Sequence, residues 1–403
     1  MIVFHLLLVA VVNREQISHA EKPMEKPYYL KKVENINALD KEETAILKKV
    51  SDRFAFRANN YYLSLIDWED PDDPIRRIII PDAGELEEWG KIDPSDEKDY
   101  TIIPGLQHKY NSTALLLVSK VCGGICRYCF RKRIFLNKQD DTLRDMPAAL
   151  KYIKAHTEIT NVLLTGGDPL ILSTNRLQDI ISNLFEIKHI KIIRIGTKLL
   201  SFNPHRVLGD PSLLDMIKRH TETYRKIYIM AHFSHPRELT DEAVNAATRL
   251  RESGAILVNQ TPMIRRVNDD PEILAELFRR LSFIGVPPYY IFQCRPALGN
   301  KAYAVPIEEG YQIFENAKAR VSGLAKRARF VMSHSTGKLE IVGMTDHHVY
   351  FKYHRAARDS DSGLFVGFER NRHAYWLDDY SEPVETIPVY SNTDRITQVN
   401  LVA

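Results

Sequence analysis

The feature that most constrains the fold of this chain is a regular alternation of two kinds of segment over its centre. Short apolar, β-branched runs have the length of buried parallel strands, and the longer stretches between them have helical periodicity. Strands that alternate with helices wind in a right-handed sense, so we predict an α/β fold, a partial (βα)6 barrel that is closed or nearly closed. The predicted strands are Ala114–Ser119, Asn161–Leu164, Ile192–Ile195, Ile227–Ala231, Ile256–Asn259 and Tyr289–Phe292, and the predicted helices are Pro147–His156, Asn175–Ile187, Pro211–Arg219, Glu238–Ser253 and Pro271–Ile284.

Chemically unusual residues follow most of the predicted strands. A cysteine-rich loop follows the first strand, a Thr-Gly-Gly-Asp-Pro turn begins at Thr165 after the second, and His232, Gln260 and Arg295 follow the fourth, fifth and sixth. The carboxyl ends of parallel strands meet at one rim of a barrel, and barrel enzymes carry their active sites there. We therefore predict one site at this rim.

The composition favours an enzyme that acts on a small molecule. Of 403 residues, 55 are Lys or Arg and 52 are Asp or Glu, so the formal net charge is +3, and 44% are apolar. Such a chain buries a sizeable core, which excludes a disordered, collagen-like or small disulfide-rich protein. Acids and bases are interspersed, without the basic patch that is typical of a nucleic-acid binder. We expect neither a nucleic-acid nor a membrane partner.

We expect three regions along the chain. Residues 1–100 are an N-terminal segment with a charged, helix-rich cap, residues 101–300 contain the barrel core, and residues 301–403 hold a C-terminal extension that becomes irregular from about residue 345. The apolar run Ile2–Val12 is too short to span a bilayer. No basic residue precedes it as in a signal peptide, and Met24 would serve as a start codon. An unused upstream start, a buried terminal segment and a targeting segment all stay open at this point.

Three of the four cysteines, Cys122, Cys126 and Cys129, form a C-x3-C-x2-C cluster. Disulfides between such near neighbours would stabilise the fold little, so the spacing indicates a ligand set in a reducing, cytoplasmic compartment. Three local thiolates on a [4Fe–4S] cluster leave one iron open to a non-protein ligand. A zinc site would need a second C-x2-C or H-x-H group, which this sequence lacks, so the spacing favours iron–sulfur. Cys294 is expected to be a small buried residue instead.

This motif resembles the signature of the radical S-adenosylmethionine (SAM) superfamily. Over about residues 85–345 the chain further resembles the lysine 2,3-aminomutase family, whose members are isomerases. The expected fold is thus a radical SAM barrel. The motifs that carry this resemblance are Pro104-Gly-Leu-Gln-His-Lys-Tyr110, Cys126-Arg-Tyr-Cys-Phe-Arg-Lys-Arg133, Leu164-Thr-Gly-Gly-Asp-Pro-Leu170, His232-Phe-Ser-His-Pro236, Asn259-Gln260 and Pro288-Tyr-Tyr290.

The resemblance implies a [4Fe–4S] cluster and SAM at the predicted rim. Cys122, Cys126 and Cys129 would bind the cluster, its open iron would hold SAM, and an electron from the reduced cluster would cleave SAM to a 5′-deoxyadenosyl radical. Flavodoxin or ferredoxin is the expected electron donor. The residues expected at SAM are Tyr128 on the adenine face, Gly166 and Gly167 where backbone approaches the ligand, Asp168 for the ammonium group, His232 and Gln260.

The family also uses pyridoxal 5′-phosphate (PLP). Lys338 matches the lysine that binds PLP covalently, although the glycine run before it is reduced to one glycine. Lys109 and Tyr110 match positions that grip the phosphate and stack nearby. The family's arginine three residues beyond the tyrosine is Thr113 in this chain.

The substrate positions depart furthest from the lysine-specific members. Arg131 matches the arginine that pairs with the substrate α-carboxylate. Where those members have two aspartates for the ε-ammonium group of lysine, this chain has Arg295 and Ser333. Arg295 would repel lysine, so we expect a 2,3-aminomutase that moves the α-amino group of a free glutamate- or aspartate-like amino acid to Cβ. The cysteine-rich C-terminal metal site of some members is absent from the sequence, so zinc is not expected.

Two other functions stay open from the sequence. One is a lysine-type aminomutase that acts on free lysine or on a lysyl group of elongation factor P, since the enzyme for that factor has a similar Cys-Arg-Tyr-Cys-Phe-Arg run. The other is a radical SAM relative without PLP, which the shortened glycine loop would suit. We expect a homo-oligomer in each case.

Overall fold

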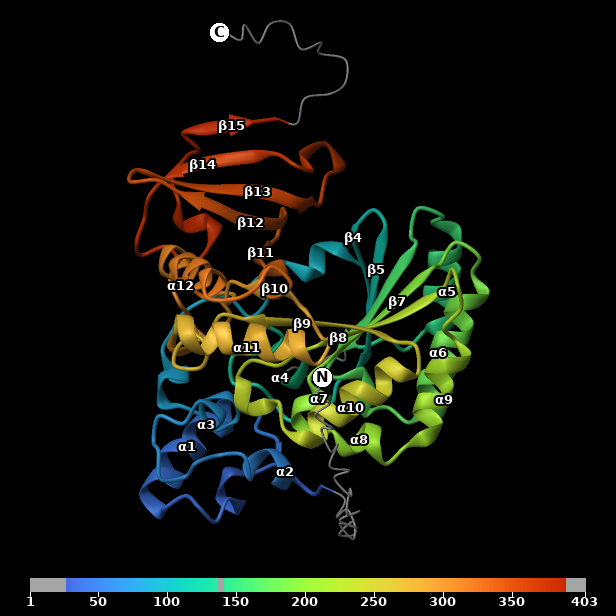
Figure 1. The fold of residues 1–403 in the computed structure, drawn as a ribbon, viewed down its shortest axis with the longest axis horizontal. Helices are drawn as coiled ribbons and strands as arrows, with labels where there is room; N and C mark the ends of the chain where they lie inside the picture. Colours follow the sequence, from blue (N-terminus) through green and yellow to red (C-terminus); the bar gives the residue numbers. More distant parts are fainter. Residues whose placement is uncertain (1–26, 137–140, 389–403) are drawn as a thin grey trace, which may run out of the picture.

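The structure is a computed structural model that describes residues 27–136 and 141–388 (Figure 1). The apolar run Ile2–Val12 and the alternative start at Met24 lie outside the described residues. Within the described part of the chain, no helix has both the length and the apolar character needed to cross a bilayer.

Six parallel strands form the centre of the structure and are paired in their chain order. Each predicted strand is present, and the helices between them cover the outer side (Figure 1). The predicted α/β fold with a partial (βα)6 barrel is confirmed. The strands are β5 (Thr113–Ser119), β6 (Asn161–Gly166), β7 (Ile192–Thr197), β8 (Lys226–Ala231), β9 (Ile256–Pro262) and β10 (Pro288–Phe292), and the helices are α4 (Arg133–Leu136), α5 (Met146–Ala155), α6 (Thr174–Glu186), α7 (Leu199–Phe202), α8 (His205–Leu208), α9 (Pro211–Arg219), α10 (Asp241–Glu252) and α11 (Pro271–Phe283).

Register across the strands places apolar side chains in layers. Leu116, Leu164, Ile195 and Ile229 are partners on four successive strands, and each is fully buried. Burying one such side chain stabilises the fold by roughly 1.5–3 kcal/mol, so the β-branched runs that predicted the strands also form the core.

Capping residues set the helix starts. Ser173 caps α6 by accepting a hydrogen bond from the backbone N–H of Arg176, and Asp270 caps α11, whose first residue is Pro271. The predicted start of one helix, at Glu238, was wrong. Thr240 caps α10, so that helix begins at Asp241, and Pro236–Glu238 form a separate 3-10 turn.

The sheet continues on both sides of the six central strands. Strand β11 (Arg329–His334) pairs in parallel with β10, and four antiparallel strands follow it, so much of the C-terminal extension is an orderly part of the sheet. Those strands are β12 (Gly337–Met344), β13 (His348–Ala356), β14 (Phe365–Glu369) and β15 (Glu385–Ile387), with β3 (Thr101–Ile103) and β4 (Leu106–Tyr110) at the opposite edge and helix α12 (Ile307–Ala319) before β11.

Side chains connect the two sides of this open sheet. The Tyr100 hydroxyl group donates a hydrogen bond to the carbonyl of Ser335 at 2.6 Å, and Asn111 Nδ2 donates to Asp359 Oδ2 at 3.0 Å. Lys109 Nζ donates to the carbonyl of His334. The segment around β4 therefore lies against the β11–β12 turn. Side chains bridge the gap between these two parts of the open sheet.

An N-terminal cap packs against the barrel with a core of its own (Figure 1, blue). Tyr62, Ile75 and Ile78 are fully buried in this second core, together with Tyr128 and Phe202 from the barrel loops. The cap thus covers the loop that carries the cysteines. Its elements are β1 (Tyr29–Leu30), α1 (Lys41–Arg53), β2 (Ala58–Asn59), α2 (Asn60–Leu63) and α3 (Pro74–Ile79).

Candidate active site

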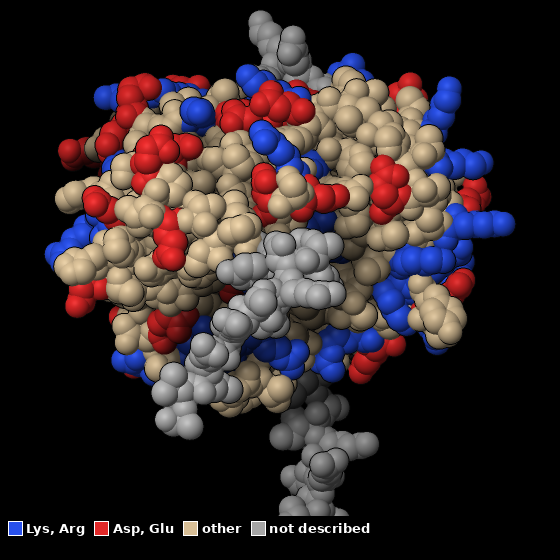
Figure 2. Space-filling model, turned by 90° about the horizontal axis from the view of Figure 1, so that it is seen from above, with Lys and Arg blue, Asp and Glu red and all other residues tan. Residues whose placement is uncertain are grey.

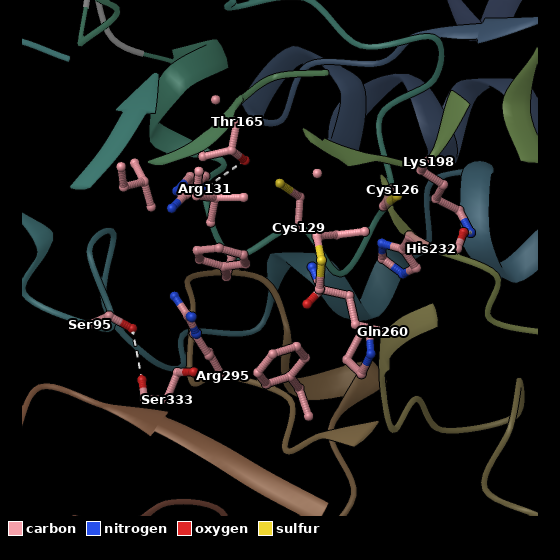
Figure 3. Close-up of a pocket in the computed structure, with 18 of the residues that line it drawn as sticks. Ser95, Cys126, Cys129, Arg131, Thr165, Lys198, His232, Gln260, Arg295 and Ser333 are labelled. Carbon is pink, nitrogen blue, oxygen red and sulfur yellow. Dashed lines mark hydrogen bonds between the residues drawn. The ribbon is translucent and has the colours of Figure 1, made fainter. Parts of the chain in front are cut away.

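All of the predicted site residues line one cavity of about 360 Å³ at the carboxyl ends of the central strands. Figure 3 shows two sides of it, with Cys126, His232 and Gln260 on one and Arg131 and Arg295 on the other. The fold thus brings together predicted site residues that lie as far apart in the sequence as Lys109 and Lys338. The lining includes Lys109, Tyr110, Cys122, Cys126, Tyr128, Cys129, Arg131, Gly166, Gly167, Asp168, His232, Gln260, Arg295, Ser333 and Lys338.

The cap fastens the cysteine loop by hydrogen bonds to its backbone. Arg57 Nε donates to the carbonyl of Cys122 at 2.8 Å, and the N–H of Ile125 donates to the carbonyl of Arg57 at 2.9 Å. Asn59 Nδ2 donates to the carbonyl of Gly123 at 3.1 Å. The loop conformation therefore depends on residues more than sixty positions earlier in the chain.

A buried ion pair anchors the side chain between the second and third cysteines. Arg127 is 1% exposed and meets the fully buried Glu85 through two bonds, Nε to Oε1 and Nη2 to Oε2, both 2.8 Å long. Lys132 Nζ lies 3.4 Å from the same carboxylate, and the Tyr303 hydroxyl donates to it at 3.1 Å. Glu85 thus balances two buried cations next to the cysteine loop.

Changing Glu85 to Gln is expected to lower the free energy of unfolding by about 3–5 kcal/mol, because Arg127 and Lys132 would stay buried without a counter-charge. Urea titration followed by circular dichroism measures this loss. Glu88→Gln is the matched control, since Glu88 pairs with Arg53 at the surface with its side chain 78% exposed, and its change should stay below about 1 kcal/mol. Equal losses in the two variants would show that the buried pair contributes no more than a surface pair.

The three cysteines are half-buried in the cavity wall. Burial raises the pKa of the Cys126 thiol to about 12, and it shifts the pKa values of Cys122 and Cys129 in the same direction. Thiols in such surroundings become thiolate ligands when they bind a metal. Among the described residues, the one group of three or more His, Cys, Asp or Glu side chains whose ligand atoms lie within 4.8 Å of one another is His108, His156 and Glu158.

Polar side chains beside Cys126 are joined in a buried network. The Tyr128 hydroxyl is 2.9 Å from Ser234 Oγ and 3.3 Å from His232 Nε2. Lys198 Nζ donates to the carbonyl of His232 at 3.1 Å and forms an ion pair of 2.6 Å with Glu238. Burial lowers the pKa of His232 well below its usual range, so this ring is neutral and offers a nitrogen lone pair.

Two glycines at the end of β6, Gly166 and Gly167, let stretches of protein backbone approach each other closely. A Cβ atom on Gly166 would lie 2.4 Å from the carbonyl oxygen of Ser119, and one on Gly167 would lie 2.4 Å from that of Val121. Gly166 also has a φ of +121°, which other residues rarely adopt. The two glycines therefore let this turn pack directly on the chain that leads into the cysteine loop.

Asp168 is held by the protein itself. Its Oδ2 accepts hydrogen bonds from Thr197 Oγ1 and from the N–H of Lys198, both at 2.8 Å, and its Oδ1 accepts one from the N–H of Leu170. Burial raises the pKa of this carboxyl to about 6 in spite of these bonds. Asp168 therefore orients the loops after β6 and β7, and only a remaining lone pair is left for a ligand ammonium group.

Lys338 presents an unpaired amine to the cavity. Its Nζ lies 4.1 Å from the centre of the Tyr290 ring, and within the described residues it forms neither a hydrogen bond nor an ion pair. Burial and the nearby guanidinium groups of Arg194 and Arg355 lower its pKa well below the usual value for lysine. A lowered pKa favours the neutral, nucleophilic form of this amine.

Arg131 is oriented by Glu97 and keeps part of its guanidinium group free. Nε and Nη2 donate to the Glu97 carboxylate, with a shortest distance of 2.7 Å, and Nη1 donates to Thr165 Oγ1 at 3.1 Å. Burial opposes ionisation of Glu97, but Arg131 and Arg133 outweigh it and lower its pKa. A guanidinium group has five N–H donors, so one on each of Nη1 and Nη2 stays available for a carboxylate.

Arg295 has no such partner. Its guanidinium carbon lies 3.7 Å from the centre of the Phe130 ring, and Nη1 is buried without a hydrogen-bond partner in the described structure. Burial lowers the pKa of Arg295 to about 10. Glu340 on β12 pairs with Arg329 at 2.6 Å rather than with Arg295. Ser333 lies near Arg295 in the cavity wall, where its carbonyl accepts a bond from Ser95 Oγ (Figure 3).

The cavity is strongly cationic, although the outer surface is not. On the face shown in Figure 2, acidic and basic side chains are interspersed. In the cavity wall seven basic side chains face two acidic ones, Glu97 and Asp168. Three of the basic residues were not predicted from the sequence, because nothing in their local sequence distinguishes them from surface residues. The seven are Lys109, Arg131, Arg194, Lys198, Arg295, Lys338 and Arg355.

Comparisons with known proteins agree with this site. Residues 116–278 match the Radical SAM superfamily. A protein of Aquifex aeolicus with the provisional name L-lysine 2,3-aminomutase is 55% identical over 357 residues, which cover 88% of this chain and 96% of that protein. This chain belongs to the lysine 2,3-aminomutase family of radical SAM enzymes. It is thus an enzyme of the aminomutase class, an isomerase.

Two further relatives carry different substrate names. The L-lysine 2,3-aminomutase of Clostridium subterminale is 37% identical over 71% of this chain and 68% of its own length. The glutamate 2,3-aminomutase of Clostridioides difficile is 35% identical over 72% of this chain and 68% of its own length. Membership of the aminomutase family therefore leaves the substrate to be argued from the cavity.

The superfamily implies a [4Fe–4S] cluster and SAM, and the residues present fit both. Three thiols on one loop can hold three irons, and the neighbouring Tyr128, His232 and Gln260 offer an aromatic face and neutral polar groups to an adenine ring. In this family the reduced cluster and SAM together supply the radical that starts the reaction.

Proposed function

We propose that this aminomutase moves the α-amino group of a free amino acid with an acidic side chain, glutamate or aspartate, to Cβ, and that it uses PLP. The observation that carries the proposal is Arg295, whose guanidinium group lies in the cavity wall with a buried Nη1 that has no hydrogen-bond partner among the described residues. A buried cation without a partner is costly, and a carboxylate of the substrate would remove that cost.

The positions of the two arginines suit a short dicarboxylic amino acid. The guanidinium carbons of Arg131 and Arg295 lie 4.7 Å and 3.7 Å from the centre of the same ring, that of Phe130. The two guanidinium carbons therefore lie no farther apart than the sum of these two distances. Glutamate or aspartate can therefore place its α-carboxylate on Arg131 and its side-chain carboxylate on Arg295.

Lysine is a poor match for the same cavity. Its ε-ammonium group would approach Arg295 in place of the aspartate that serves lysine-specific relatives. Like charges in a site with little water cost several kcal/mol. Lys109 and Arg355 add positive charge to the same wall, and the nearest carboxylate, Glu97, is already bonded to Arg131 and Arg133.

PLP is supported by Lys338 and the cationic wall around it. When bound, PLP supplies a covalent carrier for the migrating amino group. The lowered pKa of Lys338 favours the neutral amine that binds an aldehyde, and basic side chains suit the phosphate. Arg131 and Arg295 would then fix both ends of the substrate, so that Cβ is held in one orientation for hydrogen abstraction.

Replacing Arg295 by Asp should lower kcat/KM for the acidic substrate at least ~100-fold and raise it for lysine, because one change removes a repulsion and supplies a partner. Anaerobic assays with isotope-labelled glutamate, aspartate and lysine, analysed for the β-amino products, measure the ratio. Arg295→Gln is the control. It should lose the preference for the acidic substrate without gaining activity on lysine.

The proposed substrate would be ruled out if the unmodified enzyme converted free lysine faster than either acidic amino acid and Arg295→Asp left that preference unchanged. Intact-mass analysis of elongation factor P after incubation with the enzyme tests the lysyl-protein alternative. A mass shift in the factor, without conversion of any free amino acid, would likewise refute the proposal.

A further inference from the structure

Arg355 reaches across the mouth of the barrel from β13. Its Nη2 donates hydrogen bonds to Ser112 Oγ at 3.1 Å and to Thr113 Oγ1 at 3.2 Å, and its guanidinium carbon lies 4.4 Å from the centre of the Tyr110 ring. Within the described residues it forms no ion pair. The site therefore contains a guanidinium group fixed by neutral hydroxyls, with its charge uncompensated.

Arg194 supplies a second uncompensated charge to the same wall. It lies on β7, and its Nε donates to Asn161 Oδ1 at 2.8 Å. Asn161 is the register partner of Thr113, so Arg194 is held one strand beyond the hydroxyls that hold Arg355. Both arginines line the cavity, and neither has a carboxylate partner among the described residues.

Lys338 lies beside this pair. It is the register partner of Arg355 on the neighbouring strand, and directly opposed residues of antiparallel strands have Cβ atoms about 4.5–5.5 Å apart. Two guanidinium groups that are held by neutral side chains and converge on one cavity, with the amine of Lys338 beside them, are costly to bury without an anion. A group with two negative charges would offset that cost.

We propose that Arg355, together with Arg194, binds the phosphate of PLP. The inference rests on the proposed use of PLP and adds a binding residue that no family motif assigns. The family arginine three residues beyond Tyr110 is replaced by Thr113, and the guanidinium group of Arg355 lies at the hydroxyl of that threonine. The charge lost from β5 is thus supplied from β13. A planar guanidinium group binds phosphate oxygens in pairs, which a hydroxyl cannot do.

The aldehyde and the phosphate-bearing group of PLP lie on adjacent positions of its ring. Lys338 and Arg355, their proposed partners, lie side by side on the adjacent strands β12 and β13. The ring of Tyr110, below Arg355, adds an aromatic face close to the same place. Each carboxylate of the proposed substrate has one negative charge, and the two already have Arg131 and Arg295 as candidate partners. The phosphate dianion is therefore the better match for Arg355 and Arg194.

The test compares PLP with pyridoxal, which has the aldehyde but lacks the phosphate. Binding of each to the cluster-reconstituted full chain is followed by absorbance. Arg355→Gln should weaken PLP about 10- to 100-fold and leave pyridoxal nearly unchanged, so the ratio of the two affinities falls. Lys352→Gln, which removes an exposed charge from the same strand, should change neither affinity.

The ratio distinguishes lost phosphate contacts from damage to the fold, since misfolding weakens both ligands alike. Arg194→Gln is an independent second test, because Arg194 is held by a different side chain from those that hold Arg355. Arg355→Lys should restore part of the preference for PLP. An unchanged ratio in Arg355→Gln overturns the inference and leaves the proposed function intact. An unmodified enzyme that binds neither PLP nor pyridoxal overturns both.

Discussion

Changing Cys126 to Ala is expected to abolish the iron–sulfur cluster, with iron and sulfide falling from about four of each per chain to background. The same loss is expected for Cys122→Ala and Cys129→Ala. Each thiol would hold one iron, and one iron is already left to SAM, so a further lost ligand leaves two irons without protein donors. Anaerobic reconstitution followed by iron and sulfide analysis and electron paramagnetic resonance measures the effect.

Cys294→Ala is the matched control for this prediction. Cys294 is 2% exposed and lines the same cavity, but it lies beyond β10 rather than on the cysteine loop, and its sulfur donates a hydrogen bond to the carbonyl of Arg295 at 4.0 Å. This variant should keep full iron and sulfide. A complete cluster in Cys126→Ala, or its loss in Cys294→Ala, would contradict the assignment.

Changing Lys338 to Ala should eliminate both the covalent retention of PLP and aminomutase activity. The amine is unpaired, its pKa is lowered, and it faces the uncompensated cations of the cavity. Borohydride reduction of the PLP-loaded enzyme followed by peptide mapping should place the pyridoxyl mass on the peptide that contains Lys338. Among the described residues of the cavity, no other lysine has an unpaired amine, a lowered pKa and a match to the family's PLP-binding lysine.

Lys109→Gln serves as the control for the label. Burial lowers the pKa of Lys109 to about 8, but its Nζ donates a hydrogen bond to the carbonyl of His334, so its amine is engaged. In Lys109→Gln the label should stay on Lys338, with weaker binding of PLP. A label on any other lysine would refute the role of Lys338. Failure of the enzyme to take up PLP at all would favour a radical SAM relative without this cofactor.

Local sequence determined the barrel and the cysteine set because both depend on short-range patterns. A buried strand needs a run such as Ile192–Ile195 whatever surrounds it, and the helix starts at Ser173 and Asp270 depend on the capping residue itself. The C-x3-C-x2-C spacing likewise sets its ligand geometry within one loop. The helix start at Thr240 was missed only because a short turn before it continued the helical pattern.

The irregular-looking C-terminal region shows where local patterns stop being informative. Residues after about 345 mix charged and aromatic side chains, yet they form β13, β14 and β15. A strand at the outer part of a sheet is buried on one face or not at all, so its composition carries little signal. Its pairing partners, rather than its own residues, define it as a strand.

The sequence by itself determined the fold class, the family and the residues that face one rim. Only the tertiary structure decided which charges in the cavity are free. Glu97 neutralises Arg131 from 34 positions away, and Arg355 joins Thr113 across a separation of 242 positions. Nη1 of Arg295 has no hydrogen-bond partner among the described residues. Pairing between distant residues depends on how the sheet curves and closes, and a charged side chain has the same local pattern whether it lies in solvent or in a buried cavity.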